Sequence, residues 1–312
     1  MNNKLWIIGG ANVDICGTAQ DEIIEKDSNI GHIGIQFGGV GRNVAEICAR
    51  LGVDVSFVTC FSSDANGKLL QEDCKNKGID ISHSIVSDKY PSSMYLAILD
   101  KDGDMHVGMN DMRILNEIDE SLIESIFQNI NPEDMLMIDG NLSDSLVSYI
   151  SKHKPCMIAS DPVSVAKCKN LDGILNQLDI FKPNAYEAYE YTGIKITDPE
   201  SARENLVYFL NRGVKEVIIS LANHGVLFGT QDELLWLTHR QIHLENATGG
   251  GDNFLGAYIT QRLRGVRPKD ALYFAITAAV SAIERSAEDR KTLSTEVIES
   301  MIEAMEIKEL VL

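Results

Sequence analysis

The residues best suited to chemistry lie near the C-terminal end of the chain, where Thr248 and three consecutive glycines precede Asp252. Consecutive glycines let backbone N–H groups turn toward one point, and the start of a following helix adds donors, so this segment can hold an anion such as a phosphate. A carboxylate beside such a cradle is better suited to take a proton from the attacking group than to bind phosphate. The alternative is that Asp252 is an ordinary helix N-cap, where aspartate is favoured.

Two further polar clusters lie in the N-terminal part of the chain. Asn12 and Asp14 follow the first expected strand, at 5–9, and could form either an Asx turn or a ligand-binding pair. Segment 38–43, with the sequence Gly-Gly-Val-Gly-Arg-Asn, leads into a helical pattern and resembles a dinucleotide-binding fingerprint. Val44 stands where that fingerprint has its third glycine, which disfavours binding of a dinucleotide here. Segment 66–69 lacks the leading glycine and the Ser or Thr of a Walker phosphate loop.

The elements that must position these residues alternate along much of the chain between apolar strand-like runs and helical patterns. This β-α-β order predicts a mostly parallel sheet covered by helices on both faces, with ligands at the carboxyl ends of the strands. The expected strands are 5–9, 55–60, 135–138, 156–160, 180–182 and 217–221, and the expected helices are 44–51, 69–77, 121–130, 143–151, 201–211, 252–263, 269–285 and 294–308.

Two segments interrupt this order with alternating apolar and polar residues. They are 33–37 and 93–109, and an Asp-Gly turn inside the second predicts a hairpin. Short antiparallel strands inserted early in a parallel α/β domain indicate a small lid over the ligand edge of the sheet. We therefore expect a single domain over 1–312, with lid strands inserted at about 13–38 and 92–112. The edge strands of the lid could also pair across a homodimer.

The overall charge excludes some classes of partner. The net charge is −18, from 46 acidic and 28 basic residues, and no basic tract occurs, which argues against nucleic acid or an anionic membrane surface as a partner. No apolar run approaches the ~18 residues of a membrane span. The N-terminus resembles a first strand rather than a signal peptide, and six scattered cysteines without metal-ligand spacing indicate reduced thiols in a cytoplasmic protein.

Taken together, segments 38–43 and 248–252 resemble the paired signatures of the ribokinase-like (PfkB) family of sugar and nucleoside kinases. The resemblance runs in order over essentially the whole chain and includes Asn12-Val13-Asp14, Lys182-Pro183-Asn184 followed by Glu187, and Ser220-Leu221-Ala222. It implies an α/β fold of the ribokinase-like type: a three-layer sandwich with a mostly parallel central sheet, helices on both faces and a small β-sheet lid. Its implied ligands are ATP, Mg²⁺ and a small sugar or nucleoside.

The resemblance also implies a role for each matched residue. Asp252 would deprotonate the acceptor hydroxyl, while the glycine N–H groups beside it stabilise the transferring phosphoryl group. Asn184 and Glu187 would act on Mg²⁺ through its waters, because Mg²⁺ keeps much of its hydration shell. The implied sets are Gly249, Gly250, Gly251 and Asp252 for catalysis, Asn12, Asp14, Gly39, Asn43 and Asn110 for the acceptor, and Asn184, Ser220, Ala222, Gly225, Thr248 and Gly251 for ATP.

Residues 103–115, which include Asn110-Asp111-Met112, are similar to the lid region of bacterial pseudouridine kinases. This similarity narrows the choice of acceptor. This similarity implies transfer of the ATP γ-phosphate to the 5′-hydroxyl of pseudouridine. A capped turn at a hairpin exit is the purely structural explanation of the same residues. The alternatives are a kinase of a simple sugar such as ribose or fructose, a kinase of another nucleoside, and a non-catalytic sugar or nucleoside sensor.

Four positions depart from the family pattern. Gly250 replaces a usual alanine, and Ala222 replaces a usual glycine near the expected nucleotide. Asn246 and Ala247 stand where many members have Asp and Thr beside a monovalent cation. Asparagine can offer a carbonyl oxygen but no charge, which disfavours activation by K⁺.

Overall fold

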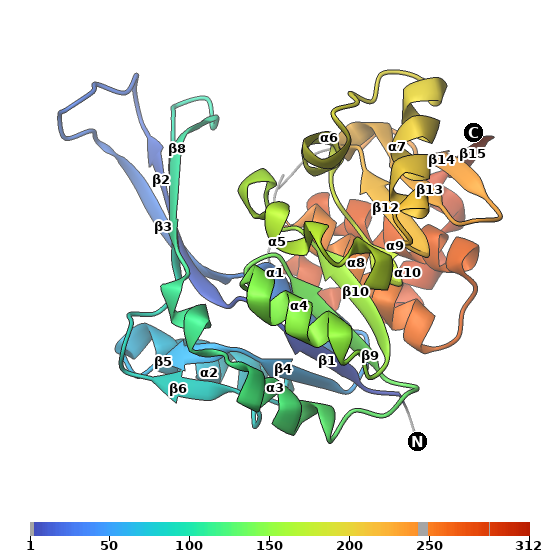
Figure 1. Cartoon of the computed structure of the whole chain (residues 1–312). Helices are drawn as coiled ribbons and strands as arrows, with labels where there is room; N and C mark the ends of the chain where they lie inside the picture. The colour runs from blue at the N-terminus through green and yellow to red at the C-terminus, as the bar shows by residue number, and fades with distance from the viewer. Residues whose placement is uncertain (1–2, 243–248, 287) are drawn as a thin grey trace.

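A large β-sheet forms the centre of the fold, as seen in the computed structural model (Figure 1). The structure describes residues 3–242, 249–286 and 288–312. Within these ranges, nine strands are hydrogen-bonded in the order β15-β14-β13-β12-β11-β10-β9-β1-β4. Pairing is parallel from β4 to β12 and antiparallel from β12 to β15. The strands are β1 (Leu5–Ile8), β4 (Val55–Val58), β9 (Met135–Asp139), β10 (Met157–Asp161), β11 (Ile180–Phe181), β12 (Glu216–Ser220), β13 (Val226–Gly229), β14 (Leu234–Thr238) and β15 (Lys308–Val311).

Strand β1 lies inside this sheet, and all of its side chains are buried. Ile7 pairs with Phe57 of β4 on one side and with Met137 of β9 on the other. A strand covered by helices on both faces has no solvent side, which explains why its sequence is continuously apolar instead of alternating. The mostly parallel sheet predicted from these apolar runs is confirmed.

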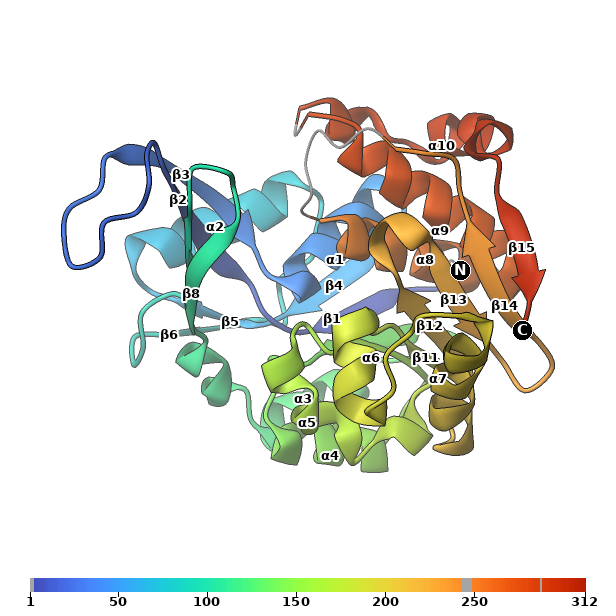
Figure 2. The ribbon, with the colours of Figure 1, turned by 90° about the horizontal axis from the view of Figure 1, so that it is seen from above.

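Helices cover both faces of the sheet, and each layer packs on its own apolar core (Figures 1 and 2). The predicted arrangement of three layers is therefore confirmed. One layer holds α1 (Val40–Arg50), α2 (Ala65–Asn76), α8 (Gly250–Leu263), α9 (Pro268–Ile283) and α10 (Thr295–Met301), and the other holds α3 (Glu120–Phe127), α4 (Asp144–Lys152), α5 (Lys169–Asp172), α6 (Ala185–Thr192) and α7 (Pro199–Asn211). Short 3₁₀ helices are η1 (Arg113–Glu117), η2 (Val165–Lys167), η3 (Leu175–Gln177), η4 (Ala222–His224), η5 (Asp289–Thr292) and η6 (Glu303–Met305).

A second, smaller sheet projects from the main body beside the N-terminal half of the large one (Figure 1). In the described chain it has the order β3-β2-β7-β8, with β2 (Asn12–Ala19), β3 (Gly31–Gly38), β7 (Met94–Leu99) and β8 (Met105–Asp111). The expected antiparallel pairs are present as β2 with β3 and β7 with β8, but the two pairs are joined by parallel pairing of β2 with β7, which was not predicted. Both inserted segments leave the main sheet in the same outward direction. A further pair, β5 (Cys60–Ser62) and β6 (Ile85–Ser87), forms a two-stranded sheet.

Several predicted boundaries need correction. The strand expected at 55–60 is two strands in different sheets, β4 and β5, and the helix expected at 294–308 ends at Met301. The chain after it returns as β15, where Val311 pairs with Leu235 of β14. The helix was predicted too long because a short apolar run fits either a helix or a strand until its partner is known. Strands β13 and β14 were not predicted.

No helix in residues 3–242, 249–286 or 288–312 combines the length and apolar character needed to cross a membrane.

Candidate active site

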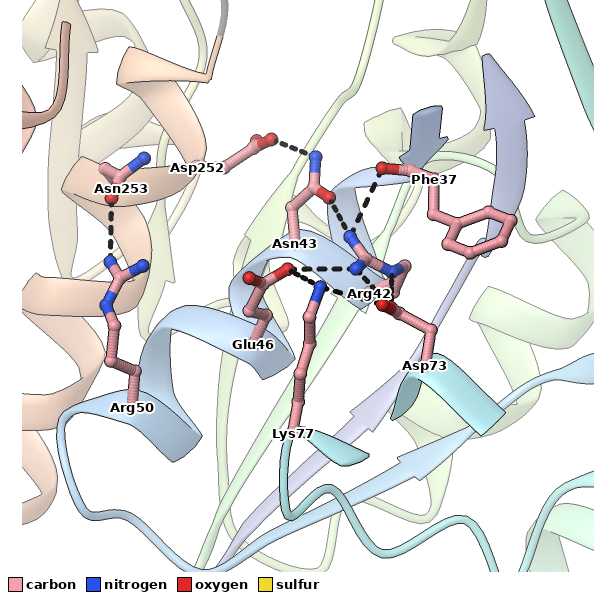
Figure 3. A network of polar contacts seen from close by, with 9 residues as sticks. All are labelled: Phe37, Arg42, Asn43, Glu46, Arg50, Asp73, Lys77, Asp252 and Asn253. Atoms are coloured by element: carbon pink, nitrogen blue, oxygen red, sulfur yellow. Dashed lines mark hydrogen bonds and ion pairs between the residues drawn. The ribbon is translucent and has the colours of Figure 1, made fainter. Parts of the chain in front are cut away.

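The two glycine-rich segments of the sequence meet where helices α1 and α8 begin. The side-chain Nδ2 of Asn43 donates a hydrogen bond to Oδ2 of Asp252 at 2.8 Å, across 209 residues of chain (Figure 3). The two helices pack closely because position 256 has no side chain: a Cβ there would lie 2.7 Å from Cγ2 of Ile47. Gly256 therefore sets the spacing that brings Asn43 to Asp252.

Asp252 lies inside the first turn of α8, and Gly249 is the N-cap, without a side-chain hydrogen bond. The interpretation of Asp252 as the N-cap is therefore wrong, because the helix begins two residues earlier than expected, at Gly250. The carboxylate reaches across to Asn43 instead. The N–H groups of a first helical turn have no partners within the helix, so Gly250 and Gly251 supply donors beside this carboxylate.

The surroundings of Asp252 alter its proton affinity. Burial, together with the negative charges of Asp161 and Asp139, raises the pKa of Asp252 to about 7, while the hydrogen bond from Asn43 and the charge of Lys182 oppose this rise. A carboxylate that titrates near neutral pH is present in both forms there. It can accept a proton from a bound hydroxyl far more readily than an ordinary aspartate could.

The residues predicted to bind the acceptor gather beside Asn43. Asn12 opens strand β2, and its Nδ2 donates to Oδ1 of Asp14. Burial raises the pKa of Asp14 to about 6. Gly39, between β3 and α1, has a φ of 100° and passes so near the carbonyl oxygen of Gly10 that no side chain would fit. The prediction of an Asx turn at Asn12 is not observed, because these residues form part of the small sheet.

A buried aspartate that the sequence interpretation missed organises this corner. Asp139 ends strand β9, and its Oδ2 accepts hydrogen bonds from the backbone N–H groups of Gly10 at 2.9 Å and Gly41 at 3.0 Å. Its Oδ1 accepts from the N–H of Asn141 at 2.9 Å. One carboxylate therefore joins the ends of β1 and β9 to the first turn of α1. The available signal was an acidic residue directly after the apolar run 135–138, followed by glycine.

Asn110 lies at the far edge of the small sheet, separated from Asp14 by one strand. The register pairs Asp14 with Tyr95 and Tyr95 with Asn110, which puts the three side chains on one face. Asn110 also lines a groove of about 640 Å³ together with Asn141, which follows strand β9. Lys167 donates to Oδ1 of Asn141 through its ammonium group. The groove therefore connects the small sheet to the end of β9.

The predicted nucleotide residues form a second group, at the ends of β11 and β12. Asn184 and Ser220 make an isolated parallel bridge, so the two segments run side by side. Ala222 begins η4 and Gly225 directly follows it, with positive φ values of 50° and 91°. Such a φ strains an alanine but not a glycine, which explains why glycine would be the easier residue at position 222. Thr248 belongs to this group by prediction, but it lies outside the described residues, as do Asn246 and Ala247.

The candidate magnesium residues, Asn184 and Glu187, form a capping box at the start of α6. Oδ1 of Asn184 accepts from the N–H of Glu187 at 3.0 Å, and Oε2 of Glu187 accepts from the N–H of Asn184 at 2.8 Å. Burial and the nearby charge of Asp161 raise the pKa of Glu187, although Lys182 opposes the rise. The ammonium group of Lys182 lies 2.8 Å from Oδ2 of Asp161.

This chemistry fits a hydrated magnesium ion better than an enclosed one. Asp161 and Glu187 are only 5% and 3% exposed, so a phosphate-bound Mg²⁺, which needs few direct protein ligands, would interact with this corner through its waters. In the described chain no cluster of three or more His, Cys, Asp or Glu side chains could enclose a metal ion.

Comparison with known proteins agrees with this architecture. The model of the pfkB family of carbohydrate kinases matches residues 2–293. The chain is 28% identical to pseudouridine kinase of Escherichia coli over 96% of each protein. A carbohydrate kinase from Agrobacterium tumefaciens superposes with a TM-score of 0.81 at 22% identity, over 99% of this chain and 100% of that one. Ribokinase of Arabidopsis thaliana complexed with ribose and ATP superposes with a TM-score of 0.81 at 21% identity, over 97% and 99%.

These similarities extend over nearly the full length of each protein, and the fold is ribokinase-like. The chain therefore belongs to the pfkB family and is a sugar or nucleoside kinase, a phosphotransferase with a hydroxyl acceptor.

Proposed function

We propose that this protein transfers the γ-phosphate of ATP to the 5′-hydroxyl of pseudouridine. The observation that carries the proposal is the pair formed by Asn43 and Asp252. The pair joins a carboxylate in the first turn of α8, with a pKa of about 7, to an amide of α1. The similarity to pseudouridine kinase of E. coli over 96% of both chains supports the choice of acceptor.

In the proposed reaction, Asn12, Asp14 and Asn43 hold hydroxyl groups of the ribose, and Asn110 contacts the acceptor from the small sheet. Asp252 accepts the proton of the attacking hydroxyl. The N–H groups of Gly249, Gly250 and Gly251 stabilise the negative charge that builds up on the transferred phosphoryl group. Ser220, Ala222, Gly225 and Thr248 line the nucleotide site. Bound with ATP, Mg²⁺ would neutralise phosphate charge, with its waters facing Asn184 and Glu187.

The small sheet is proposed to be a lid within a single domain. Its register puts Asp14, Tyr95 and Asn110 on one face. The opposite face carries Ile33, Ile35, Val107 and Met109, which are between 50% and 76% exposed. An exposed apolar face of this kind supports a homodimer in which lids cover each other.

A kinase of a simple sugar is the second candidate. Its support is the overall similarity of fold to the Arabidopsis ribokinase that was complexed with ribose and ATP. Met94 and Leu96 line the groove beside Asn110 and Asn141, but Leu96 pairs with Met109 on the face of the small sheet opposite to Asp14, so this lining does not distinguish the two acceptors. A sensor without activity would have no need for a carboxylate titrating near neutral pH.

A panel of acceptors tests the proposal. Purified protein is given ATP and Mg²⁺ with pseudouridine, uridine, inosine, ribose or fructose, and ADP release and the mass of each product are measured. We expect the highest kcat/KM for pseudouridine. A higher value for ribose or fructose would replace this proposal with the second candidate, and nucleoside binding without any product would indicate a sensor. Omitting K⁺ from the buffer shows whether a monovalent cation is required, and we expect it is not.

A further inference from the structure

The side chain of Arg42 is buried beside the site, although no role has been assigned to it, and only 3% of it is exposed. Its Nη1 donates to Oδ1 of Asn43 at 2.9 Å and to the carbonyl oxygen of Phe37 at 3.3 Å (Figure 3). Phe37 is near the end of β3, where the small sheet joins helix α1. One guanidinium group therefore contacts both the root of the small sheet and the amide that faces Asp252.

Two carboxylates hold the guanidinium from its other side. Nε of Arg42 donates to Oδ2 of Asp73 at 3.1 Å, Nη2 donates to the same oxygen, and Nη2 lies 2.9 Å from Oε2 of Glu46. Lys77 bridges both carboxylates, at 2.7 Å from Glu46 and 3.1 Å from Asp73. Two cations and two anions thus alternate around a closed group that joins α1 to α2. Such an arrangement fixes the guanidinium plane much more firmly than one exposed ion pair would.

The chemistry of arginine determines which way the Asn43 amide points. A guanidinium can only donate hydrogen bonds, so the amide atom beside Arg42 must be the oxygen. The amide nitrogen then faces Asp252 and donates to the carboxylate, as observed. If the amide turned over, its oxygen would face the carboxylate, and its NH₂ group would face a cation.

We propose that Arg42 is a positioning residue that fixes the Asn43 amide, so that this amide donates to Asp252 and stays aligned with the root of the small sheet. The inference rests on the proposed function, because it concerns the environment of the proposed base. Arg42 acts through Asn43 and has no contact with the reacting atoms.

The proton affinity of Asp252 reports this arrangement. The groups that face it are Asp139 from β9, Asp161 from β10, Lys182 after β11 and Asn43 from α1. Of these, the hydrogen bond from Asn43 lowers the pKa of Asp252, so the loss of this bond moves the midpoint of the Asp252 titration to higher pH. Lysine at position 42 keeps the charge, but it is a point donor that cannot satisfy Phe37, Asn43 and Asp73 together.

The experiment follows the side-chain amide of Asn43 by ¹H–¹⁵N NMR in asparagine-labelled protein while the pH is varied. The resonance is assigned by its absence from Asn43→Ala. In the unsubstituted protein we expect a midpoint at about pH 7, reporting Asp252. In Arg42→Lys we expect the midpoint to rise by about one pH unit, which corresponds to the loss of one hydrogen bond to a charged group. An unchanged midpoint in folded Arg42→Lys overturns the proposal.

Two further variants separate positioning from folding. Arg262→Lys weakens another ion pair, which is partly buried and in which Nη2 lies 2.7 Å from Oε1 of Glu216; within the described chain, no hydrogen bond or ion pair of Arg262 involves Asn43 or Asp252. In Arg262→Lys the midpoint of the Asp252 titration should stay at the value of the unsubstituted protein. An equal rise of this midpoint in Arg262→Lys and Arg42→Lys would mean a general loss of packing and would overturn the proposal. Where Arg42→Lys does not fold, Asp73→Asn serves instead, because it removes the charge that holds Nε and Nη2. It should shift the midpoint in the same direction by less, and no shift overturns the proposal.

Kinetic measurements provide a second, independent test of the role of Arg42. At pH 7, Arg42→Lys should lower kcat about fivefold from the change in ionised Asp252 alone, with little change in the KM for ATP. In the Asn43→Ala background the same substitution should change kcat less than twofold, and independent, multiplying effects would contradict a route through Asn43. The NMR midpoint needs no turnover. A moved midpoint in a protein that phosphorylates no acceptor would sustain this inference and reject the proposed function.

Discussion

Around Asp139, hydrogen bonds with buried side chains hold the backbone in place. Around η4, the conformation of the main chain itself determines where the loop lies. In the first region, the carboxylate of Asp139 accepts hydrogen bonds from three N–H groups. Arg42, which is one of four charged side chains that bind each other, donates a hydrogen bond to Asn43. In the second region, Ala222 and Gly225 adopt positive φ values, and Ser220 contributes a main-chain bridge to Asn184. The first region is rigid in its side chains and the second is strained in its main chain.

The difference suggests how the two proposed substrates are recognised. A ribose presents hydroxyl groups at fixed positions, so rigid amides and carboxylates can discriminate among acceptors. A nucleotide phosphate accepts from any well-placed N–H, so loops and a helix start are sufficient. Substitutions beside Asp139 should therefore alter acceptor kinetics, and substitutions near η4 should alter nucleotide kinetics.

The largest effect is expected for Asp252→Asn, close to Asp139 of the first region. Asparagine keeps the shape of the side chain but cannot accept the hydroxyl proton, so kcat should fall by about 10²- to 10⁴-fold while acceptor binding survives. Steady-state assays and calorimetric titration with pseudouridine check the two parts. Turnover within tenfold of the unsubstituted enzyme would remove Asp252 from its proposed role.

In Asp252→Asn the free energy of unfolding should also depend on pH differently from that of the unsubstituted protein. The pKa of Asp252 is raised in the folded protein from 3.8 to about 7, so the folded state binds more protons than the unfolded state between these values. The stabilisation from this group is present below pH 4 and is lost as the pH rises through about 7. Urea unfolding of Asp252→Asn should therefore show a weaker fall in stability over that range, and an identical slope would contradict the raised pKa.

An intermediate effect is expected for Asp139→Asn, in the region held by side chains. The amide keeps one acceptor oxygen, but its NH₂ group meets backbone donors, so the free energy of unfolding should fall by about 1–3 kcal/mol. The KM for the acceptor should rise more than the KM for ATP, because Gly10 and Gly41 border the acceptor cluster. Asp134→Asn is a matched control: this carboxylate binds the backbone of Lys4 at the opposite end of the strands. An equal rise in both KM values would remove the distinction between the two regions.

The smallest effect is expected for Ala222→Gly, in the region held by the main chain. Glycine relieves a left-handed φ that costs alanine about 1–2 kcal/mol, but it adds about 0.5–1 kcal/mol of unfolded-chain entropy. The net gain in stability should be about 1 kcal/mol or less, with a changed KM for ATP and an unchanged KM for the acceptor. Thermal unfolding and kinetics measure this. A loss of stability would show that the backbone at Ala222 is not strained.

Much of the fold could be predicted from local sequence. The continuous apolar runs at β1 and β9 indicated strands buried on both faces, because only such strands avoid solvent-facing residues. By contrast, strand β15 was not predicted, and the helix expected at 294–308 ran into its first residue, because nothing local shows that β14 offers this segment an edge. The parallel pairing of β2 with β7 was also hidden, since it depends on the direction in which two separate insertions leave the main sheet.

The sequence by itself determined which residue types are available: three glycines with a carboxylate, an amide after a second glycine run, and paired polar residues after the first strand. Tertiary structure alone decided that Asp252 lies within the first helical turn, that Asn43 faces it, and that Asp139 and Arg42 hold the surrounding groups. The reason is physical. Burial, neighbouring charges and helix-to-helix spacing set the pKa of Asp252, and each arises from segments that are distant in the chain.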